Sequence, residues 1–456
     1  MSEDKNTQHL KMLGRRIWSE ANDLKRTPEA LANETGVPLE TVQAVIAGDA
    51  DEKVAYQLVK TMVKAYPISL TQLWVERDDT DSGVHVMRGA SSQKTSRIFD
   101  RRDRDGALTP FYEYRDTAMS RLAPFKPEWI QPIRVVSDAD PDNPDVAYNH
   151  GHLMHQLTFF IGEVNFYWKQ RGKTYCREMN TGNSNYITPY VPHSYTSRNP
   201  DKLGLIIAIT YGDQVRQSLG DFGHMGSVAA DELAGDLRDA LGAFGAKLGR
   251  QLTAESLGAR ELVERLDAAG IGRARCEALA AAAALPTPQE LEVLAEALNV
   301  RASDLLVSGL GEQEEVVVRT ETDSLVRAYP DGNSPTCNLT ELARCRHQPN
   351  LKGFEMTLLG GAAEFRHGLH EYMFNYGDTP VSLSWQGGHE AVLDPGDSAY
   401  VRPMVAHSLA RLPDRDEGHL AVVRTPGALS DAVIDEYASY PAEGRGRASR
   451  EDRTWI

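Results

Sequence analysis

The stretch "NHGHLMHQLTFFIGEV", from Asn149 to Val164, decides how this chain is interpreted. It holds three histidines and a glutamine within seven residues, and it continues as an apolar, aromatic run. The whole chain of 456 residues has only 13 histidines, so this density needs an explanation. Imidazole is a common metal ligand, and a short apolar run bounded by a turn is typical of a β-strand. The stretch therefore predicts a metal site on a β-structure.

The spacing of the polar residues recurs later in the chain. His152 and Gln156 are four residues apart, and His193 follows 41 residues after His152. The second half repeats this pattern within one residue, and the aligned residues are His367, Glu371 and His407. Two histidines and one further ligand on one face suit mononuclear, non-haem Fe(II) and O₂. We expect His150 and His155 to be exposed or to support the ligands rather than to bind the metal themselves.

The segments around both sets have the character of short strands. Examples are "GLIIAITYG", "GFEMTLLGG" and "LDPGDSAYVRPMVAHSL", which are rich in Gly, Pro, Thr, Tyr and Val. Many short strands with tight turns predict a β-sandwich or barrel. The Pro-Gly-Asp turn that leads into a strand and then a histidine is common in double-stranded β-helix (cupin) barrels.

Each β segment follows a helical one. In Leu24–Asp49, Thr27 can cap a helix that begins with Pro28, and apolar residues recur at helical spacing around a glycine turn. A similar passage spans Glu261–Leu306. Both have the pattern of a small helix-turn-helix domain.

The sequence therefore predicts an α+β protein made of two tandem modules. Each module is a helix-turn-helix-like domain followed by a cupin barrel. We expect a first helical domain at 1–78, a catalytic cupin at 79–222, a second helical domain at 223–312, a second and degenerate cupin at 313–430, and a C-terminal tail at 431–456.

Composition excludes several partners. The formal net charge is −16, which argues against a non-specific grip on nucleic acid or on an anionic membrane. No apolar run is long enough to span a bilayer, and the polar N-terminus is not a secretory signal. The four cysteines form no CxxC pair, so we expect free thiols in the cytoplasm.

The two ligand sets differ in strength and surroundings. Gln156 is a weaker ligand than Glu371, which taken alone favours the second site as the active one. However, the first module carries about 19 more residues before its first metal histidine. We expect these extra residues near Phe99–Asp116, whose arginines and tyrosines suit a phosphate-like dianion. With no counterpart expected in the second module, its site would be structural or a relic of duplication.

Together, the duplicated plan and the phrases "RDG", "FYEY", "NHGH" and "PHSY" resemble the hydroxyethylphosphonate dioxygenase and methylphosphonate synthase family. Hydroxypropylphosphonate epoxidase is its smaller relative. The resemblance covers nearly the whole chain. It implies Fe(II), O₂ and 2-hydroxyethylphosphonate as partners, and no 2-oxoglutarate, because the substrate supplies all four electrons.

The resemblance also implies roles for particular residues. His152 and His193 would be the iron histidines. Some members have a carboxylate six residues before the second histidine, where this chain has Ile187; others have a glutamine at the place of Gln156. The positions that match the family's phosphonate-binding residues are Lys25, Arg104, Tyr112, Tyr114, Asn149 and Thr210. Of these, Lys25 and Tyr114 would also act in catalysis.

Alternatives remain at this point. The family contains a dioxygenase that yields hydroxymethylphosphonate and formate and a synthase that yields methylphosphonate and carbon dioxide. Of the two, we expect the dioxygenase. A helix-turn-helix fused to a cupin is also the plan of transcription regulators, but Pro38–Asp49 has no basic residue for base contacts. A cupin isomerase that acts on a sugar phosphate would use the same residues. We expect a possible homo-oligomer and neither nucleic acid nor membrane as a partner.

Overall fold

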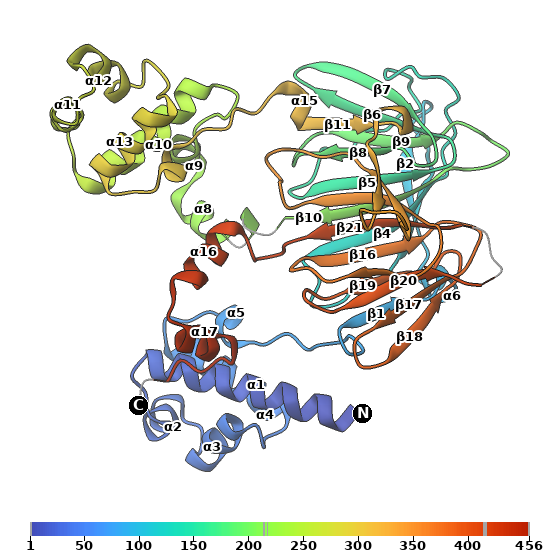
Figure 1. Cartoon of the computed structure of the whole chain (residues 1–456). Helices are drawn as coiled ribbons and strands as arrows, with labels where there is room; N and C mark the ends of the chain where they lie inside the picture. Colours follow the sequence, from blue (N-terminus) through green and yellow to red (C-terminus); the bar gives the residue numbers. More distant parts are fainter. Residues whose placement is uncertain (1, 213–214, 217, 414–416, 455–456) are drawn as a thin grey trace.

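The computed structural model describes residues 2–212, 215–216, 218–413 and 417–454. Two β-barrels lie against each other, and the two helical domains lie on the same side of this β-body, at the left in Figure 1. This arrangement confirms the α+β class and the two tandem modules.

The first helical domain has the expected helix-turn-helix character. Thr27 accepts a hydrogen bond from the Ala30 backbone N–H and caps the second helix, whose first residue is Pro28. Gly14 allows a close helix crossing, because a Cβ there would lie 2.5 Å from the carbonyl oxygens of Val45 and Ile46. The helices are α1 (Ser2–Asp23), α2 (Pro28–Thr35), α3 (Leu39–Ala47), α4 (Glu52–Ala65) and α5 (Leu70–Leu73).

The second helical domain repeats this construction. Thr287 and Glu290 form a capping box at the start of the helix Pro288–Leu298, whose first residue is Pro288. An apolar core that includes Phe244 and Leu294 holds the helices together. They are α8 (Leu219–Met225), α9 (Ser227–Ala234), α10 (Ala240–Glu255), α11 (Ala259–Ala268), α12 (Arg273–Ala280), α13 (Pro288–Leu298) and α14 (Ala302–Leu305).

The first barrel is built from a seven-stranded and a three-stranded sheet, in the orders β11-β8-β5-β10-β4-β3-β2 and β7-β6-β9. Its strands are β2 (Arg97–Arg102), β3 (Leu108–Asp116), β4 (Phe125–Pro132), β5 (His155–Ile161), β6 (Val164–Gln170), β7 (Lys173–Met179), β8 (Ser184–Ile187), β9 (His193–Ser197), β10 (Leu205–Tyr211) and β11 (Val316–Arg319). A short helix, α6 (Gly89–Gln93), precedes β2.

The second barrel has the matching orders β1-β19-β16-β21-β14-β13-β12 and β15-β20-β17-β18. Its strands are β1 (Val84–Met87), β12 (Val326–Tyr329), β13 (Cys337–Glu341), β14 (Lys352–Leu358), β15 (Ala363–Phe365), β16 (His370–Asn375), β17 (Val381–Trp385), β18 (His389–Leu393), β19 (Ser398–Val401), β20 (His407–Arg411) and β21 (Gly418–Thr425). Two short helices, α15 (Glu312–Glu315) and η1 (Glu321–Asp323), flank β11.

The two barrels exchange a strand, which the expected boundaries missed. β1 lies in the range expected for the first barrel, yet Val84 pairs with Val401 in the second. Likewise β11 follows the second helical domain, yet Val316 pairs with Ile187 in the first barrel. Val84 and Val316 are both buried in the barrel that receives them. Residues 79–222 and 313–430 therefore do not each form one barrel.

A second correction concerns the arginine- and tyrosine-rich segment. It forms the hairpin β2–β3, and the second module does have a counterpart, the hairpin β12–β13, at the same edge of its sheet. The difference is one of length and side chains, since β3 has nine residues and β13 five. The expectation of a missing segment was wrong because sequence gaps do not show which strands align.

The two seven-stranded sheets pack against each other through a shared apolar core. Phe125, Leu157 and Phe159 of the first barrel meet Tyr372 and Phe374 of the second, and all five are buried. Burial of this many large side chains is a major stabilising contribution. The β-body is thus one unit with two barrel interiors.

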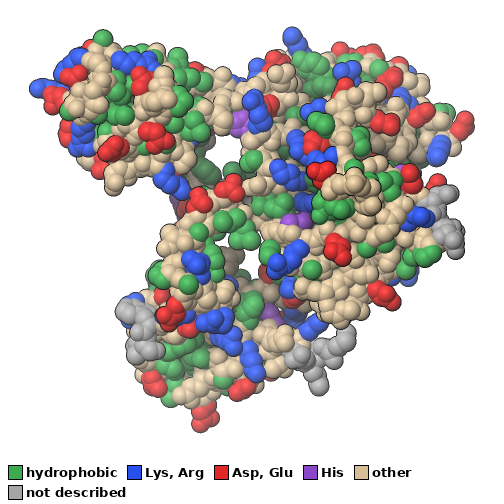
Figure 2. Space-filling model, in the orientation of Figure 1, with side chains coloured by type: hydrophobic (Ala, Val, Ile, Leu, Met, Phe, Trp, Pro, Cys, Tyr) green, Lys and Arg blue, Asp and Glu red, His purple; other side chains and the backbone are tan. Residues whose placement is uncertain are grey.

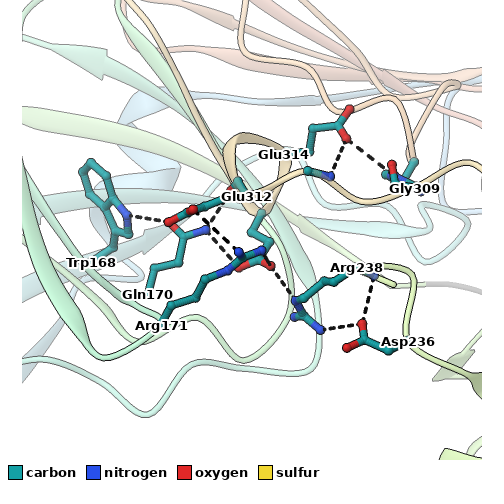
Figure 3. Close-up of polar contacts among 11 residues, drawn as sticks. Trp168, Gln170, Arg171, Asp236, Arg238, Gly309, Glu312 and Glu314 are labelled. Atoms are coloured by element: carbon teal, nitrogen blue, oxygen red, sulfur yellow. Dashed lines mark hydrogen bonds and ion pairs between the residues drawn. The ribbon is translucent and has the colours of Figure 1, made fainter. Parts of the chain in front are cut away.

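The buried carboxylate of Glu315 fastens the second helical domain to the first barrel. Its donors Gln170, Arg171 and Arg238 are labelled in Figure 3. Glu315, which precedes β11, accepts hydrogen bonds from Arg171 at 2.9 Å, from Arg238 at 2.7 Å and from Gln170 at 2.9 Å. Arg171 lies between β6 and β7, and Arg238 lies between α9 and α10. Burial raises the pKa of Glu315, but the three donors outweigh it and hold the pKa below its ordinary value.

The C-terminal segment is more ordered than the word tail implies. It contains α16 (Asp431–Ser439) and α17 (Ala442–Ser449) and returns to α1 (Figure 1). There Glu451 pairs with Arg16, and Arg453 donates to Glu20 at 2.7 Å.

Basic and acidic side chains are interspersed on the molecular surface shown in Figure 2. Among the residues described, no helix has the length and apolarity needed to cross a bilayer.

Candidate active site

The first ligand set converges inside the first barrel. His152 lies in the loop before β5, Gln156 is the second residue of β5, and His193 begins β9. The Nε2 atom of His152 lies 3.0 Å from Oε1 of Gln156. The rings of His152 and His193 are 5.3 Å apart and nearly perpendicular, at 86°. Three donor groups from separate segments therefore face one point.

Local backbone features place His152. Gly151 has φ +75°, and a Cβ there would lie 2.4 Å from the carbonyl carbon of Tyr190. This close approach lets the backbone N–H of Tyr190 donate to the carbonyl of His152 at 2.8 Å. Glycine is the residue that tolerates both the positive φ and the contact. The phrase "NHGH" thus ties the ligand loop to the loop that carries His193.

The amide of Gln156 is held in one orientation. Its Nε2 donates to Thr158 Oγ1 at 2.8 Å and to the hydroxyl of Tyr195 at 3.0 Å. Both amide hydrogens are used, so Oε1 is the atom that faces His152. Ile187, the position of the alternative carboxylate, lies directly opposite Gln156 on β8. The two positions are cross-strand neighbours, so a ligand at either one can reach the same point.

His193 is fixed as a neutral imidazole. Its Nδ1 donates to the carbonyl of Val191 at 2.8 Å, which leaves Nε2 to accept from Asn149 Nδ2 at 3.0 Å. Burial lowers the pKa of His193 to about 4. A neutral ring with a bonded Nδ1 is the form in which histidine binds a metal.

These residues fit a divalent metal. Two neutral imidazoles and a carbonyl-type oxygen are suitable ligands, and their number leaves positions for other groups. The buried Nδ1 of His152 has no hydrogen-bond partner among the described residues. An unpaired buried nitrogen is costly in a protein interior, so a ligand or ion at this ring is consistent with the geometry.

A cavity of about 300 Å³ contains the ligand set. Seven of the nine residues predicted for the first site line it, namely His152, Gln156, His193, Asn149, Tyr112, Tyr114 and Thr210. The other lining residues are Arg101, Lys126, Glu128, Ile130, Met154 and Tyr195.

Two predicted residues are not in this cavity. Arg104 lies in the turn between β2 and β3, more than half exposed, and pairs with Asp145 through a 2.7 Å hydrogen bond from Nε. Lys25 lies between α1 and α2 in the exposed part of the first helical domain, and its ammonium donates to the carbonyl of Asp23 at 3.0 Å. That domain lies beside the second barrel (Figure 1). The assignment of both residues to this pocket within one chain is therefore corrected.

Two other cations, Arg101 and Lys126, line this cavity. Arg101 lies on β2, and Lys126 lies on β4 directly opposite Thr210. Neither side chain makes a hydrogen bond or ion pair with a described residue. Arg101 stands in the same arginine run as Arg104, but a β-bulge between Phe99 and Asp100 shifts the register there. Residue alternation alone could not find it.

Two tyrosines and a carboxyl complete the wall. The Tyr112 hydroxyl accepts from the backbone N–H of Tyr195 at 2.8 Å, so Tyr112 is bound to the barrel. The Tyr114 hydroxyl has no bonded partner among the described residues, and burial raises its pKa. Burial also raises the pKa of Glu128. Tyr114 therefore faces the cavity as a neutral donor.

The second ligand set also converges, with donor atoms of His367, Glu371 and His407 within 4.8 Å of one another. Glu371 is fully buried and accepts from His367 at 3.0 Å and from His407 at 2.8 Å. It also pairs with Arg424. Burial opposes ionisation of Glu371, but Arg424 and His407 outweigh it and hold the pKa well below its ordinary value.

Comparisons with known proteins identify relatives of the whole chain. The methylphosphonate synthase of Nitrosopumilus maritimus is 35% identical to the chain over 95% of its length and 93% of that protein. A structure of Streptomyces albus HEPD with 2-hydroxyethylphosphonate and Fe(II) bound matches 98% of the chain and 99% of that protein, with a TM-score of 0.88 and 32% identity. A PhpD structure with cadmium and hydroxyethylphosphonate matches 96% of the chain and 99% of that protein at a TM-score of 0.72 and 19% identity, which supports the fold alone.

No family model matches the chain. Identity of 35% over nearly the full length of both proteins is sufficient to establish descent from a common ancestor, and both barrels and both helical domains fall within the match. The chain belongs to the family of methylphosphonate synthase and 2-hydroxyethylphosphonate dioxygenase.

Proposed function

We propose that this chain is an Fe(II)-dependent oxygenase that cleaves the C–C bond of 2-hydroxyethylphosphonate with O₂. The products would be hydroxymethylphosphonate and formate, without 2-oxoglutarate. One observation carries the proposal: a single cavity contains the His-Gln-His set and two cations, Arg101 and Lys126, without bonded partners among the described residues. A dianion that also binds a metal fits this combination.

His152, His193 and Oε1 of Gln156 would hold the iron, which supplies redox chemistry and activation of O₂ when bound. Arg101 and Lys126 would neutralise the phosphonate. Placing the substrate between these cations and the ligand set would fix its carbon chain against the metal, so orientation would provide much of the rate acceleration.

The remaining polar groups would orient the substrate. Tyr114 can donate its hydroxyl hydrogen, and Thr210 lies next to Gln156 on the neighbouring strand. Asn149 already bonds to His193. A contribution from Lys25 would require the helical domain of a second copy, because Lys25 does not line the cavity of its own chain.

The test is a single anaerobic reconstitution with Fe(II) and 2-hydroxyethylphosphonate, followed by O₂ without 2-oxoglutarate or reductant. Phosphorus NMR should show hydroxymethylphosphonate, with one formate per phosphonate consumed. An unchanged substrate signal in iron-loaded protein would refute the proposal.

A second outcome is supported by the methylphosphonate synthase relative. The same substrate and O₂ would then give methylphosphonate, carbon dioxide and water. The same NMR experiment separates the two outcomes, since the phosphonate products have different shifts. The regulator and isomerase alternatives receive no support from the proteins compared.

A further inference from the structure

The second barrel repeats the ligand geometry of the first in detail. Glu371 is the second residue of β16, as Gln156 is of β5, and His407 begins β20, as His193 begins β9. The rings of His367 and His407 meet at 89°. The Nδ1 of His407 donates to the carbonyl of Val405 at 3.0 Å, the same bond that fixes His193. On ligand types alone this set should hold Fe(II) more tightly than the first.

Access does not separate the two barrels. A cavity of about 510 Å³ at the second barrel includes His407, Phe365 and Trp385 in its wall. The side chain of His367 is also 21% exposed, so an ion from solvent can approach the second set through this histidine. The difference must lie within the ligand cluster itself.

The neighbouring strand supplies that difference. Glu371 lies directly opposite Arg424 on β21, whereas Gln156 lies directly opposite Thr210 on β10. The guanidinium of Arg424 donates to Oε2 of Glu371 and lies 5.0 Å from the ring centre of Phe365. The side chain of Arg424 is only 13% exposed. A fixed positive charge thus sits inside the second barrel, beside the carboxylate.

Both carboxylate oxygens of Glu371 already accept hydrogen bonds. Oε1 accepts from His407, and Oε2 accepts from His367 and from Arg424. A buried carboxylate requires a positive partner, and Arg424 meets that requirement without an ion. In the first barrel Gln156 and Thr210 are both neutral, so the residue that faces the ligand on the neighbouring strand carries no charge that could replace a metal ion. The charges of Glu371 and Arg424 therefore cancel, and the facing pair Gln156 and Thr210 has no charge to cancel.

We propose that the guanidinium of Arg424 takes the place of the metal in the second barrel, so that the chain binds one iron, in the first barrel. The second site is a complete ligand set closed by an internal cation. Removing that cation opens the site. Threonine, the residue at the matching position of the first barrel, is the natural replacement.

The experiment measures metal content rather than turnover. Metal-free full-length protein is incubated anaerobically with excess Fe(II) or Co(II), freed of unbound metal, and analysed for metal per chain. The wild type should bind one equivalent and Arg424→Thr two, with a second set of Co(II) absorption bands. In a His193→Ala background the values should be zero and one.

Arg344→Thr is the matched control, because Arg344 also lies over Phe354 but does not contact Glu371. It should bind one equivalent, as should Arg424→Lys, which keeps the charge. Two equivalents in the wild type, or one in folded Arg424→Thr, would overturn the proposal.

A reciprocal variant covers the case in which Arg424→Thr does not fold. The double change Gln156→Glu with Thr210→Arg transfers the second pair into the first barrel. It should reduce metal content from one equivalent to none while circular dichroism stays unchanged. Retention of one equivalent in this variant would contradict the role of the guanidinium.

Discussion

The two barrels have the same framework and opposite electrostatics. Each brings two histidines and a polar β-strand residue to one point, with matching ring geometry. The first surrounds a neutral set with the cations Arg101 and Lys126 and a cavity. The second closes an acidic set with Arg424. The difference teaches that ligand spacing alone does not define a metal site, because a residue on the neighbouring strand decides whether an ion can enter.

The largest expected effect separates the two histidines that begin β9 and β20. His193→Ala should remove the iron and lower kcat/KM by about a thousandfold or more, since the metal supplies the chemistry. His407→Ala should keep kcat/KM and iron content within about twofold of the wild-type values. Its free energy of unfolding should be about 1–3 kcal/mol lower, because Glu371 loses a hydrogen-bond donor. Iron content and steady-state kinetics at a temperature where both are folded test this. Equal losses in the two variants would erase the comparison.

The next effect distinguishes two arginines of one sequence run. Arg101→Ala should raise KM for the phosphonate by about 10–100-fold, because a charge-assisted bond to a dianion is lost. Arg104→Ala removes only the exposed pair with Asp145, and its KM should change less than about twofold. If Arg104→Ala had the larger effect, the placement of the cavity cations would be wrong.

A smaller effect is expected when the first ligand set is made identical to the second. Gln156→Glu adds a negative charge where the anionic substrate binds. We expect substrate affinity to fall about tenfold, which corresponds to about 1.4 kcal/mol. Binding to the Co(II)-loaded protein under anaerobic conditions measures this directly. An unchanged affinity would refute the idea that the neutral amide favours the dianion.

The smallest effect concerns a feature that both barrels share. His155 and His370 each contact a tyrosine hydroxyl at 2.7 Å, and burial lowers the pKa of each to about 4. Because these pKa values lie below the ordinary 6.5, the two histidines take up protons in the unfolded chain before they do so in the folded chain as the pH falls. The stability that each neutral, buried histidine contributes is therefore complete above pH 6.5 and is lost as the pH falls towards 4.

His370→Gln keeps a hydrogen-bonding group but does not titrate. Its urea midpoint should therefore fall less between pH 7 and 4.5 than that of the wild type, by an amount that corresponds to about 2 kcal/mol. The matching change at His155 should behave alike. A wild-type pH dependence in both variants would exclude these histidines as its source.

The fold followed from patterns that local physics determines. The helix cap at Thr27, the similar second helical passage and the repeat of ligand spacing predicted two helix-turn-helix and cupin modules. Three residues of the first cavity, His152, Gln156 and His193, were predictable from the repeated spacing, and four more, Tyr112, Tyr114, Asn149 and Thr210, only from the family resemblance. The family resemblance supplied roles that spacing could not.

Other features depend on contacts that no local pattern encodes. Arg101 replaced Arg104 because of a bulge between Phe99 and Asp100, and Lys126 reaches the site only through the pairing of β4 with β10. Arg424 lies 53 residues from Glu371, so its role appears only when the two strands are adjacent. The strand exchange is likewise invisible in the linear order.

The exchanged strands have a consequence for synthesis on the ribosome. Val84 cannot pair with Val401 until that residue, 317 positions later, has been synthesised. This interval takes roughly 15–60 s at typical translation speeds. The first barrel also lacks its edge strand until Val316 has emerged. Neither barrel can complete its sheet while the other half of the chain is absent. The nascent chain therefore exposes unpaired strand edges during most of its synthesis. The strand exchange should therefore increase the dependence of folding on chaperones and leave catalysis unaffected.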